Sequence, residues 1–168
     1  MGTLFFSRCD LYGAVGGEEA NIPGALPSRL QGEWEYIQPG NTVPAEKYNI
    51  TPELIEYRGY SENGRPSSFD FTGTIRFVSN YSPGAGVIII EYEPGKKPSY
   101  SQYNNGDFCA VYYQNLQADS VQLANAIDLS GMEAPDTGTL DEAVAKFTRT
   151  NMGRFVNWSV VQPQRRVR

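Results

Sequence analysis

Two pairs of acidic residues have a spacing that could serve acid–base chemistry. Glu33 and Glu35 stand two positions apart, and so do Glu91 and Glu93. On a β-strand, residues two apart point to one face and lie about 6.6 Å apart at the backbone. The two carboxyl groups of a glycosidase are roughly 5 to 9 Å apart, so distance alone does not exclude this chemistry. The same spacing is typical of the polar outer face of a strand, and we adopt that interpretation.

A second motif with catalytic associations is Asp136-Thr137-Gly138, because the triplet Asp-Thr-Gly carries the catalytic aspartate in aspartic proteases. There the triplet follows an apolar strand. Here Glu133-Ala134-Pro135 precede it and a pattern for a capped helix follows, so we interpret it as a turn that leads into a helix N-cap. The acidic residues between 128 and 142 lack the spaced ligands of a calcium loop.

The sequence has no His and only two Cys, Cys9 and Cys109. The absence of His removes the usual general base, the Ser–His and Cys–His nucleophile pairs and the commonest metal ligand. Two Cys cannot form a zinc site by themselves. Cys109 lies in the apolar run 108–113 without an adjacent cation, which is typical of a buried, unreactive thiol. We therefore predict a protein that is not an enzyme, with no catalytic residue, metal or cofactor.

Aromatic side chains are the main candidates for ligand binding, since the chain has 11 Tyr and 8 Phe. The interior of a small β-barrel is either filled by side chains or leaves room for one ligand. Rings that point inward would line an apolar pocket whose hydroxyl groups orient the ligand. Both outcomes stay open, because strands that are apolar on both sides do not show which face points inward. The candidate ligand-binding residues are Tyr57, Phe77, Tyr92, Tyr103, Tyr112 and Tyr113.

Alternating patterns predict the strands that would position these rings. The clearest pattern covers residues 69–81. Every second residue from Phe69 to Tyr81, including Phe77, falls on one face of the predicted strand. A turn at 82–86 joins it to a strand over 87–93, which makes a hairpin. Further strands are predicted over 32–37, 46–50, 53–60, 100–103, 107–116 and 120–127, the last two forming a second hairpin.

The even spacing of these strands predicts an all-β fold, an antiparallel up-and-down β-barrel of about eight or nine strands, with a sandwich as the alternative. One C-terminal helix is added. Thr139 and Glu142 have the spacing of a capping box, and four apolar residues between 140 and 147 form one stripe that must dock on the outside of the barrel. A final strand is predicted over 154–162.

The order of these elements resembles that of the lipocalin group, the calycins in the broad sense. The resemblance is carried by Gly32-Glu33-Trp34, the helix at 140–148 and the strand at 154–162. The resemblance covers about residues 28–163. It implies that Trp34 plugs one end of the barrel and packs on an arginine of a late strand, for which Arg165 and Arg166 are candidates. Independently, a Gly at 32 lets the chain bend into the wall, and an indole is a large apolar stopper whose N–H can find a carbonyl. The alternative is that Trp34 is a core aromatic of a sandwich.

The two ends of the chain differ from this body. Residues 1–27 are rich in Gly, Ala and Pro, which predicts a flexible arm or linker. Within it, residues 4–9 (LFFSRC) resemble the end of a bacterial lipoprotein signal, in which Cys9 would receive the lipid. An incidental thiol is the alternative, because the apolar stretch is three residues long, against roughly seven to fifteen in a signal core. Residues 164–168, with three arginines, are predicted to be a solvated basic tail.

These features predict a non-enzymatic module that binds a small hydrophobic ligand in a lipocalin-like barrel and is held on the bacterial cell envelope, in the periplasm or on the outer surface, by a lipid anchor. The alternative is a structural or protein-interaction lipoprotein whose filled barrel takes no small ligand. The net charge of −5 argues against a nucleic-acid partner. No apolar run approaches the roughly 20 residues of a membrane helix, so membrane contact would be through the lipid only. The sequence predicts no oligomeric state.

Overall fold

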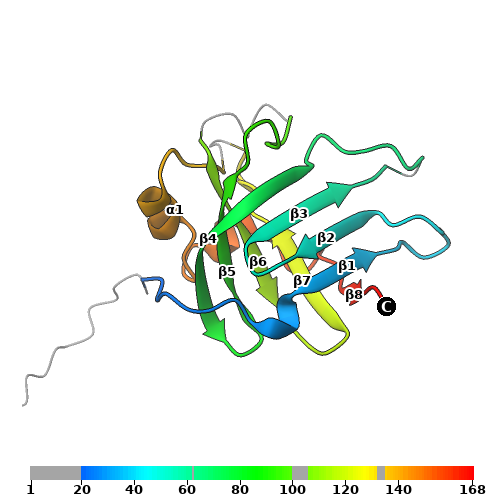
Figure 1. Cartoon of the computed structure of the whole chain (residues 1–168), viewed down its shortest axis with the longest axis horizontal. Helices are drawn as coiled ribbons and strands as arrows, with labels where there is room; N and C mark the ends of the chain where they lie inside the picture. The colour runs from blue at the N-terminus through cyan, green and yellow to red at the C-terminus, as the bar shows by residue number, and fades with distance from the viewer. Residues whose placement is uncertain (1–19, 62, 100–105, 132–134) are drawn as a thin grey trace, which may run out of the picture.

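The chain folds into a closed antiparallel β-barrel whose eight strands follow one another in sequence order (Figure 1). The computed structural model describes residues 20–61, 63–99, 106–131 and 135–168. The strands are β1 (Gly32–Tyr36), β2 (Glu46–Ile50), β3 (Leu54–Gly59), β4 (Phe71–Ser82), β5 (Ala85–Tyr92), β6 (Phe108–Gln114), β7 (Ser120–Asn125) and β8 (Gln164–Arg166). Because β8 pairs with both β7 and β1, the wall is complete. The predicted up-and-down barrel is confirmed, and the sandwich alternative is wrong.

Three short helices belong to the described part of the chain. They are the 3-10 turn η1 (Ser28–Leu30), α1 (Leu140–Lys146) and α2 (Met152–Phe155). The predicted helix near the C-terminus is confirmed as α1, which packs outside the barrel against β5 and β6 (Figure 1). None of these helices has the length and apolar character that a membrane crossing requires.

The predicted capping box of α1 is present. Thr139 Oγ1 accepts a hydrogen bond from Glu142 N at 3.3 Å, and Glu142 Oε2 accepts one from Thr139 N at 3.1 Å. We expect Thr139→Ala to lower the free energy of unfolding by about 1 kcal/mol, since the backbone amide of Glu142 loses its acceptor. A urea titration measures the loss, with Thr150→Ala in an exposed turn as control. Equal midpoints for the two variants would show that the box contributes nothing.

The final strand lies elsewhere than predicted. Residues 154–162 do not form a strand, because their first part belongs to α2 and Phe155 is buried there against Phe147, with ring centroids 5.1 Å apart. The last strand is β8, which uses three of the five residues predicted to be a solvated tail. Phe155 and Val156 are thus buried beside the helical segment, whereas Val160 is exposed, and the segment does not alternate along a strand.

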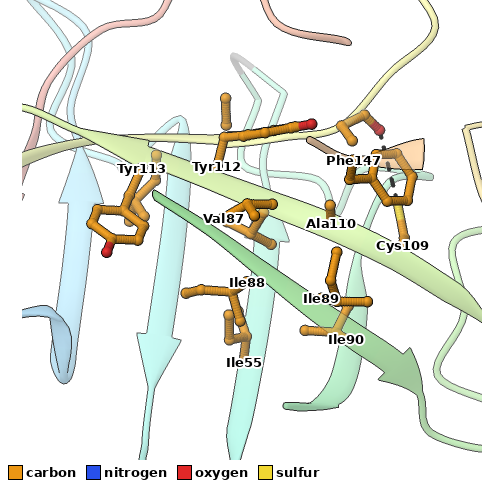
Figure 2. Packing of buried hydrophobic residues seen from close by; sticks show 14 of the residues in the cluster. Ile55, Val87, Ile88, Ile89, Ile90, Cys109, Ala110, Tyr112, Tyr113 and Phe147 are labelled. Carbon is orange, nitrogen blue, oxygen red and sulfur yellow. Dashed lines mark hydrogen bonds between the residues drawn. The ribbon is translucent and has the colours of Figure 1, made fainter. Parts of the chain in front are cut away.

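Strands β5 and β6 are buried on both faces, and this distinguishes them from the rest of the wall. Tyr112 and Tyr113 point to opposite sides of β6 (Figure 2). In the strand register Tyr113 shares the inner face with Val111 and Leu123, whereas Tyr112 lies on the outer side with Val87. The outer side is covered by α1 and its apolar stripe, so both tyrosines are almost fully buried.

The end of the predicted flexible arm is held on the barrel. Asn21 donates from Nδ2 to the carbonyl oxygens of Val144 and Phe147, at 2.8 and 2.9 Å, and so satisfies the last turn of α1. Gly24 N donates to a carbonyl of β4 at 2.7 Å. Residues 20–27 of the predicted arm thus include side-chain and backbone hydrogen bonds to the barrel and to α1. Residues 1–19 are outside the described ranges.

Candidate ligand-binding pocket

One end of the barrel is closed around the indole of Trp34. Trp34 is fully buried, and its Nε1 donates to Leu30 O of η1 at 2.8 Å. The guanidinium of Arg166 lies over the ring, 4.2 Å from its centroid. Of the two arginines that the sequence left open, the structure thus selects Arg166, while Arg165 is exposed on the other face of β8. We call this end the closed end.

Gly32 makes room for that guanidinium. Its φ is +129°, a conformation that side chains rarely adopt, and a Cβ there would lie 2.5 Å from Arg166 Nη1. Arg166 donates from Nη1 to Gln31 O at 2.8 Å and from Nε to Ala118 O at 3.0 Å, and Nη2 bonds to the carbonyl of Arg29. In the Gly-x-Trp motif, Gly32 thus leaves space for the guanidinium of Arg166, and Trp34 provides the ring on which that guanidinium stacks.

The middle of the barrel is filled by aliphatic side chains. The inner faces of the strands contribute Ile50, Ile55, Ile88, Ile90 and Val111, each no more than 1% exposed. Close packing of this kind leaves no space for a ligand between them. Any ligand site inside the barrel must therefore lie toward the opposite end, which we call the mouth.

The mouth holds a pocket of about 470 Å³. It is lined by Tyr36, Ala45, Glu46, Tyr48, Tyr57, Phe69, Leu123, Ala124, Asn125, Ile127, Val160, Val161 and Gln162. Three rim residues, Phe69, Ile127 and Val160, are exposed apolar side chains, the last of them 66% exposed. A concave site with apolar walls and a few polar groups is the usual form of a small-molecule site.

A row of aromatic rings forms one wall of this pocket and continues along the interior. The centroids of Tyr48 and Tyr57 are 4.8 Å apart, and those of Tyr57 and Phe71 are 5.7 Å apart. Tyr48 donates from its hydroxyl group to Asn125 Oδ1 at 3.1 Å. Burial, with smaller contributions from Glu46 and Asp70, raises the pKa of Tyr57, which therefore stays protonated at neutral pH.

Glu46 is the charged side chain of the pocket. It begins β2, opposite Tyr36 and Gly59 in the register. Burial raises the pKa of Glu46, and a hydrogen bond that Gln164 Nε2 donates to its Oε1 opposes the rise. Gln164 is itself fully buried and accepts from Leu123 N at 2.8 Å through Oε1. One oxygen of the carboxylate is thus fixed from β8.

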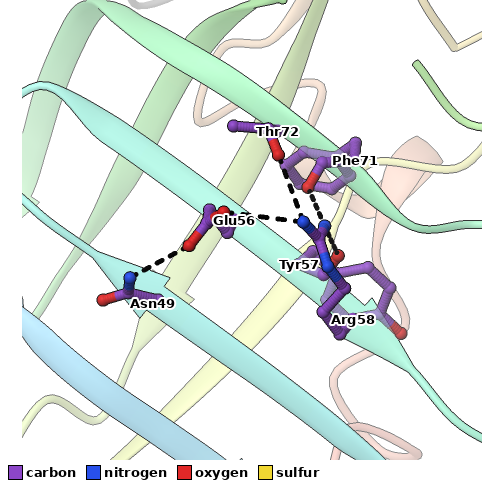
Figure 3. Close-up of polar contacts among 6 residues, drawn as sticks. All are labelled: Asn49, Glu56, Tyr57, Arg58, Phe71 and Thr72. Atoms are coloured by element: carbon purple, nitrogen blue, oxygen red, sulfur yellow. Dashed lines mark hydrogen bonds and ion pairs between the residues drawn. The ribbon is translucent and has the colours of Figure 1, made fainter. Parts of the chain in front are cut away.

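The outer face beside the pocket carries a separate polar network (Figure 3). Arg58 donates from Nη1 to the carbonyl oxygens of Tyr57 and Phe71, both at 2.8 Å, and its Nη2 lies 3.5 Å from Glu56 Oε1. Asn49 Nδ2 donates to the other oxygen of Glu56 at 3.0 Å. These bonds hold the Arg58 guanidinium on the outside of the wall, so it does not neutralise the interior.

The structure brings together few of the six predicted ligand-binding residues. In the register Tyr57, Tyr92 and Tyr113 belong to the inner face. Of the candidates in the described ranges, only Tyr57 lines the mouth pocket. Tyr113 lies toward the closed end, where burial raises its pKa to about 12. Tyr103 and the short strand predicted over 100–103 are outside the described residues.

Phe77 and Tyr112 point to the outer side, and for Phe77 the reason is a bulge in β4. The register shifts between Ile75 and Phe77, so Ile75 and Val78 face inward where strict alternation would place Phe77. The extra residue, Arg76, pairs on the outside with Glu91 at 2.6 Å. The prediction that residues 69–81 keep one apolar face throughout is therefore wrong beyond position 75.

The motifs with catalytic associations have structural roles. Asp136 is fully buried, accepts from Gly106 N at 2.9 Å and lies 3.3 Å from Lys97 Nζ, so it anchors a loop. Glu35 pairs with Lys47 at 3.7 Å on the outer face.

Burial raises the pKa of the Cys109 thiol to about 11, which leaves it un-ionised at neutral pH. No group of three or more His, Cys, Asp or Glu among the described residues could hold a metal ion.

Sequence analysis missed most of the pocket lining. Tyr36 had a usable signal, because it stands two positions after Trp34 on the same strand and so shares its face. Tyr48 stands opposite Trp34 in the register, which the sequence does not show. Glu46 and Gln164 are 118 residues apart and meet only because β8 closes the barrel.

Comparison of the chain with protein-family models, with curated proteins and with solved structures finds no match. The closed eight-stranded antiparallel barrel is compatible with a calycin-like fold. The geometry of the barrel mouth therefore carries the functional inference.

Proposed function

We propose that the protein is a non-enzymatic binding module that holds one small, largely apolar ligand in the mouth of its barrel. The observation that carries the proposal is the pocket of about 470 Å³ with tyrosine walls and exposed apolar side chains at its rim. Sites for small molecules commonly have volumes of about 300 to 1,000 Å³ and are mainly apolar, with a few polar groups that orient the ligand.

Support also comes from the division of the interior. The closed end and the middle are filled by the Trp34 ring and by aliphatic side chains, so they serve stability. Tyr36 and Tyr57 at the mouth, by contrast, are only half-buried, although apolar surface is normally buried. A module with a filled barrel, working only through its surface, would not need that hollow.

Native mass spectrometry of the protein purified from its own source tests the proposal directly. We expect an adduct of one small molecule per chain that is released by mild denaturation. A bare chain mass in that preparation, together with no binding of added apolar probes, would favour the filled-barrel alternative.

A blocking substitution provides a second test. Ala45 lines the pocket, so Ala45→Trp places a ring inside it and is expected to weaken binding of the uncharged fluorescent probe N-phenyl-1-naphthylamine at least tenfold. Val43→Trp is the matched control, because Val43 belongs to the same loop, is 48% exposed and does not line this pocket. If both variants lose the fluorescence, or if neither does, the probe does not bind specifically in this pocket.

The lipid anchor stays a proposal that rests on the sequence resemblance at residues 4–9. Cys9 would carry the lipid and hold the barrel on the bacterial cell envelope; it is outside the described residues. Fractionation of cells that produce the chain, with and without Cys9→Ser, tests it. Membrane association of both forms, or of neither, would count against the anchor.

A further inference from the structure

We propose that the mouth pocket selects an organic ammonium ion, an amine whose positive group meets Glu46 and whose apolar body lies against the tyrosines. This inference rests on the proposed function, because it specifies the chemistry of the ligand in the same pocket. The probe class that represents it is a primary arylalkylamine.

The first argument is charge. Among the residues that line the pocket, Glu46 is the one formal charge, and neither Lys nor Arg is present. Among the described residues no cation forms an ion pair with Glu46. A half-buried carboxylate without a counter-ion is costly in the free protein, and a ligand that supplies the positive charge removes that cost.

The second argument is geometry. Gln164 donates a hydrogen bond to Oε1 of Glu46, and no described residue donates one to Oε2. Gln164 cannot rotate freely, since its own oxygen is fixed by Leu123 N. The carboxylate is therefore oriented before a ligand binds and keeps one acceptor for it, which reduces the ordering cost of binding.

The third argument is that the neighbouring cations are used elsewhere. Lys47 follows Glu46 directly but points to the outer face, where it pairs with Glu35. Arg58 stands opposite Lys47 in β3 and is held outside by the bonds of Figure 3. The alternation of strand residues places both positive groups outside while Glu46 and Tyr57 point inward.

The fourth argument is the nature of the walls. The faces of tyrosine rings carry negative electrostatic potential and attract ammonium groups, most strongly where water is excluded. Tyr36, Tyr48 and Tyr57 all line the pocket with Glu46. The chain as a whole has a net charge of −5, which also favours the approach of cations.

The walls also indicate an organic cation over a metal ion. A hard metal ion requires several oxygen ligands, whereas the pocket offers one carboxylate among rings and aliphatic groups. The exposed side chains of Phe69, Ile127 and Val160 at the rim fit the apolar body of a ligand whose ammonium group enters first.

The test uses three probes of one shape observed by fluorine NMR: 2-(4-fluorophenyl)ethylamine, 2-(4-fluorophenyl)ethanol and 3-(4-fluorophenyl)propionate. On the unmodified protein we expect the amine to bind at least tenfold more tightly than the alcohol, and the propionate to bind most weakly. In Glu46→Gln the amine and the alcohol should bind within threefold of each other, because the charge is gone while the shape is kept.

Two controls keep the result interpretable. Glu33→Gln removes one carboxylate from the exposed outer face of β1 and should leave the preference for the amine unchanged. Glu46→Gln keeps the oxygen to which Gln164 donates and removes a desolvated charge, so its urea midpoint should not fall.

The outcomes separate this inference from the proposed function. Equal affinities for amine and alcohol, both abolished by Ala45→Trp, would overturn the choice of an ammonium ion. The same result would support the proposed ligand-binding function of the pocket. A preference for the amine that survives in Glu46→Gln would also overturn the inference. No binding of any of the three probes to the unmodified protein would overturn both proposals.

Discussion

Replacing Trp34 by alanine is expected to lower the free energy of unfolding by roughly 3 to 5 kcal/mol, the range for removing a fully buried aromatic side chain. The indole is 0% exposed and fills the closed end of the barrel. Its loss also removes the donor to Leu30 O and the surface on which Arg166 stacks at 4.2 Å. Since domains of this kind are stable by only about 5 to 15 kcal/mol, the loss would be a large fraction of the total.

Urea titration followed by far-ultraviolet circular dichroism measures this loss without depending on tryptophan fluorescence. Trp158→Ala is the matched control, because Trp158 is only half-buried and its Nε1 approaches Met152 Sδ at 3.4 Å. We expect a clearly smaller loss for that variant and an unchanged slope of free energy against urea concentration for both. Equal losses at the two positions would contradict the role of Trp34 as the stopper of the closed end.

The sequence predicts β1 to β7 well because local residue patterns and turn residues mark them. β2 is found within its predicted limits of 46–50, and both predicted hairpins are present. Local turn residues determine where these hairpins reverse, so no long-range knowledge is needed. The same holds for α1, whose capping box lies within four consecutive residues.

The parts that escaped prediction depend on contacts between distant segments. The bulge at Arg76 changes which rings point inward, and it is accompanied by a salt bridge to Glu91 on the next strand. β8 has only three residues, too few for an alternating pattern, and is fixed by its pairing with β1 and β7. The candidate pocket depends on the second of these features, since β8 supplies Gln164, the residue that orients Glu46.

Replacing Gly86 by alanine is expected to lower the free energy of unfolding by about 1 to 3 kcal/mol, although its backbone conformation is one that alanine adopts readily. A Cβ at this position would lie 2.3 Å from Ser79 O and 2.7 Å from the hydroxyl oxygen of Tyr113. Ser79 belongs to β4 and Tyr113 to β6, so the methyl group would press on both neighbours of β5 at once. The strands of a closed barrel cannot move apart without breaking pairs around the wall, and we therefore expect the upper part of that range.

The matched control for this variant is Gly153→Ala in α2, where a Cβ meets no heavy atom within 4 Å. Alanine in a helix is favoured over glycine by roughly 0.5 to 1 kcal/mol, so this substitution should raise stability while Gly86→Ala lowers it. Opposite shifts of the urea midpoint are the expected result. A double variant, Gly86→Ala with Tyr113→Leu, then separates the two obstacles. If it is less stable than Tyr113→Leu alone, the carbonyl of Ser79 is the obstacle. If the two are equally stable, the Tyr113 ring is the obstacle. A midpoint unchanged in Gly86→Ala would mean that β5 can shift against both neighbours, which contradicts a tightly packed wall at the closed end.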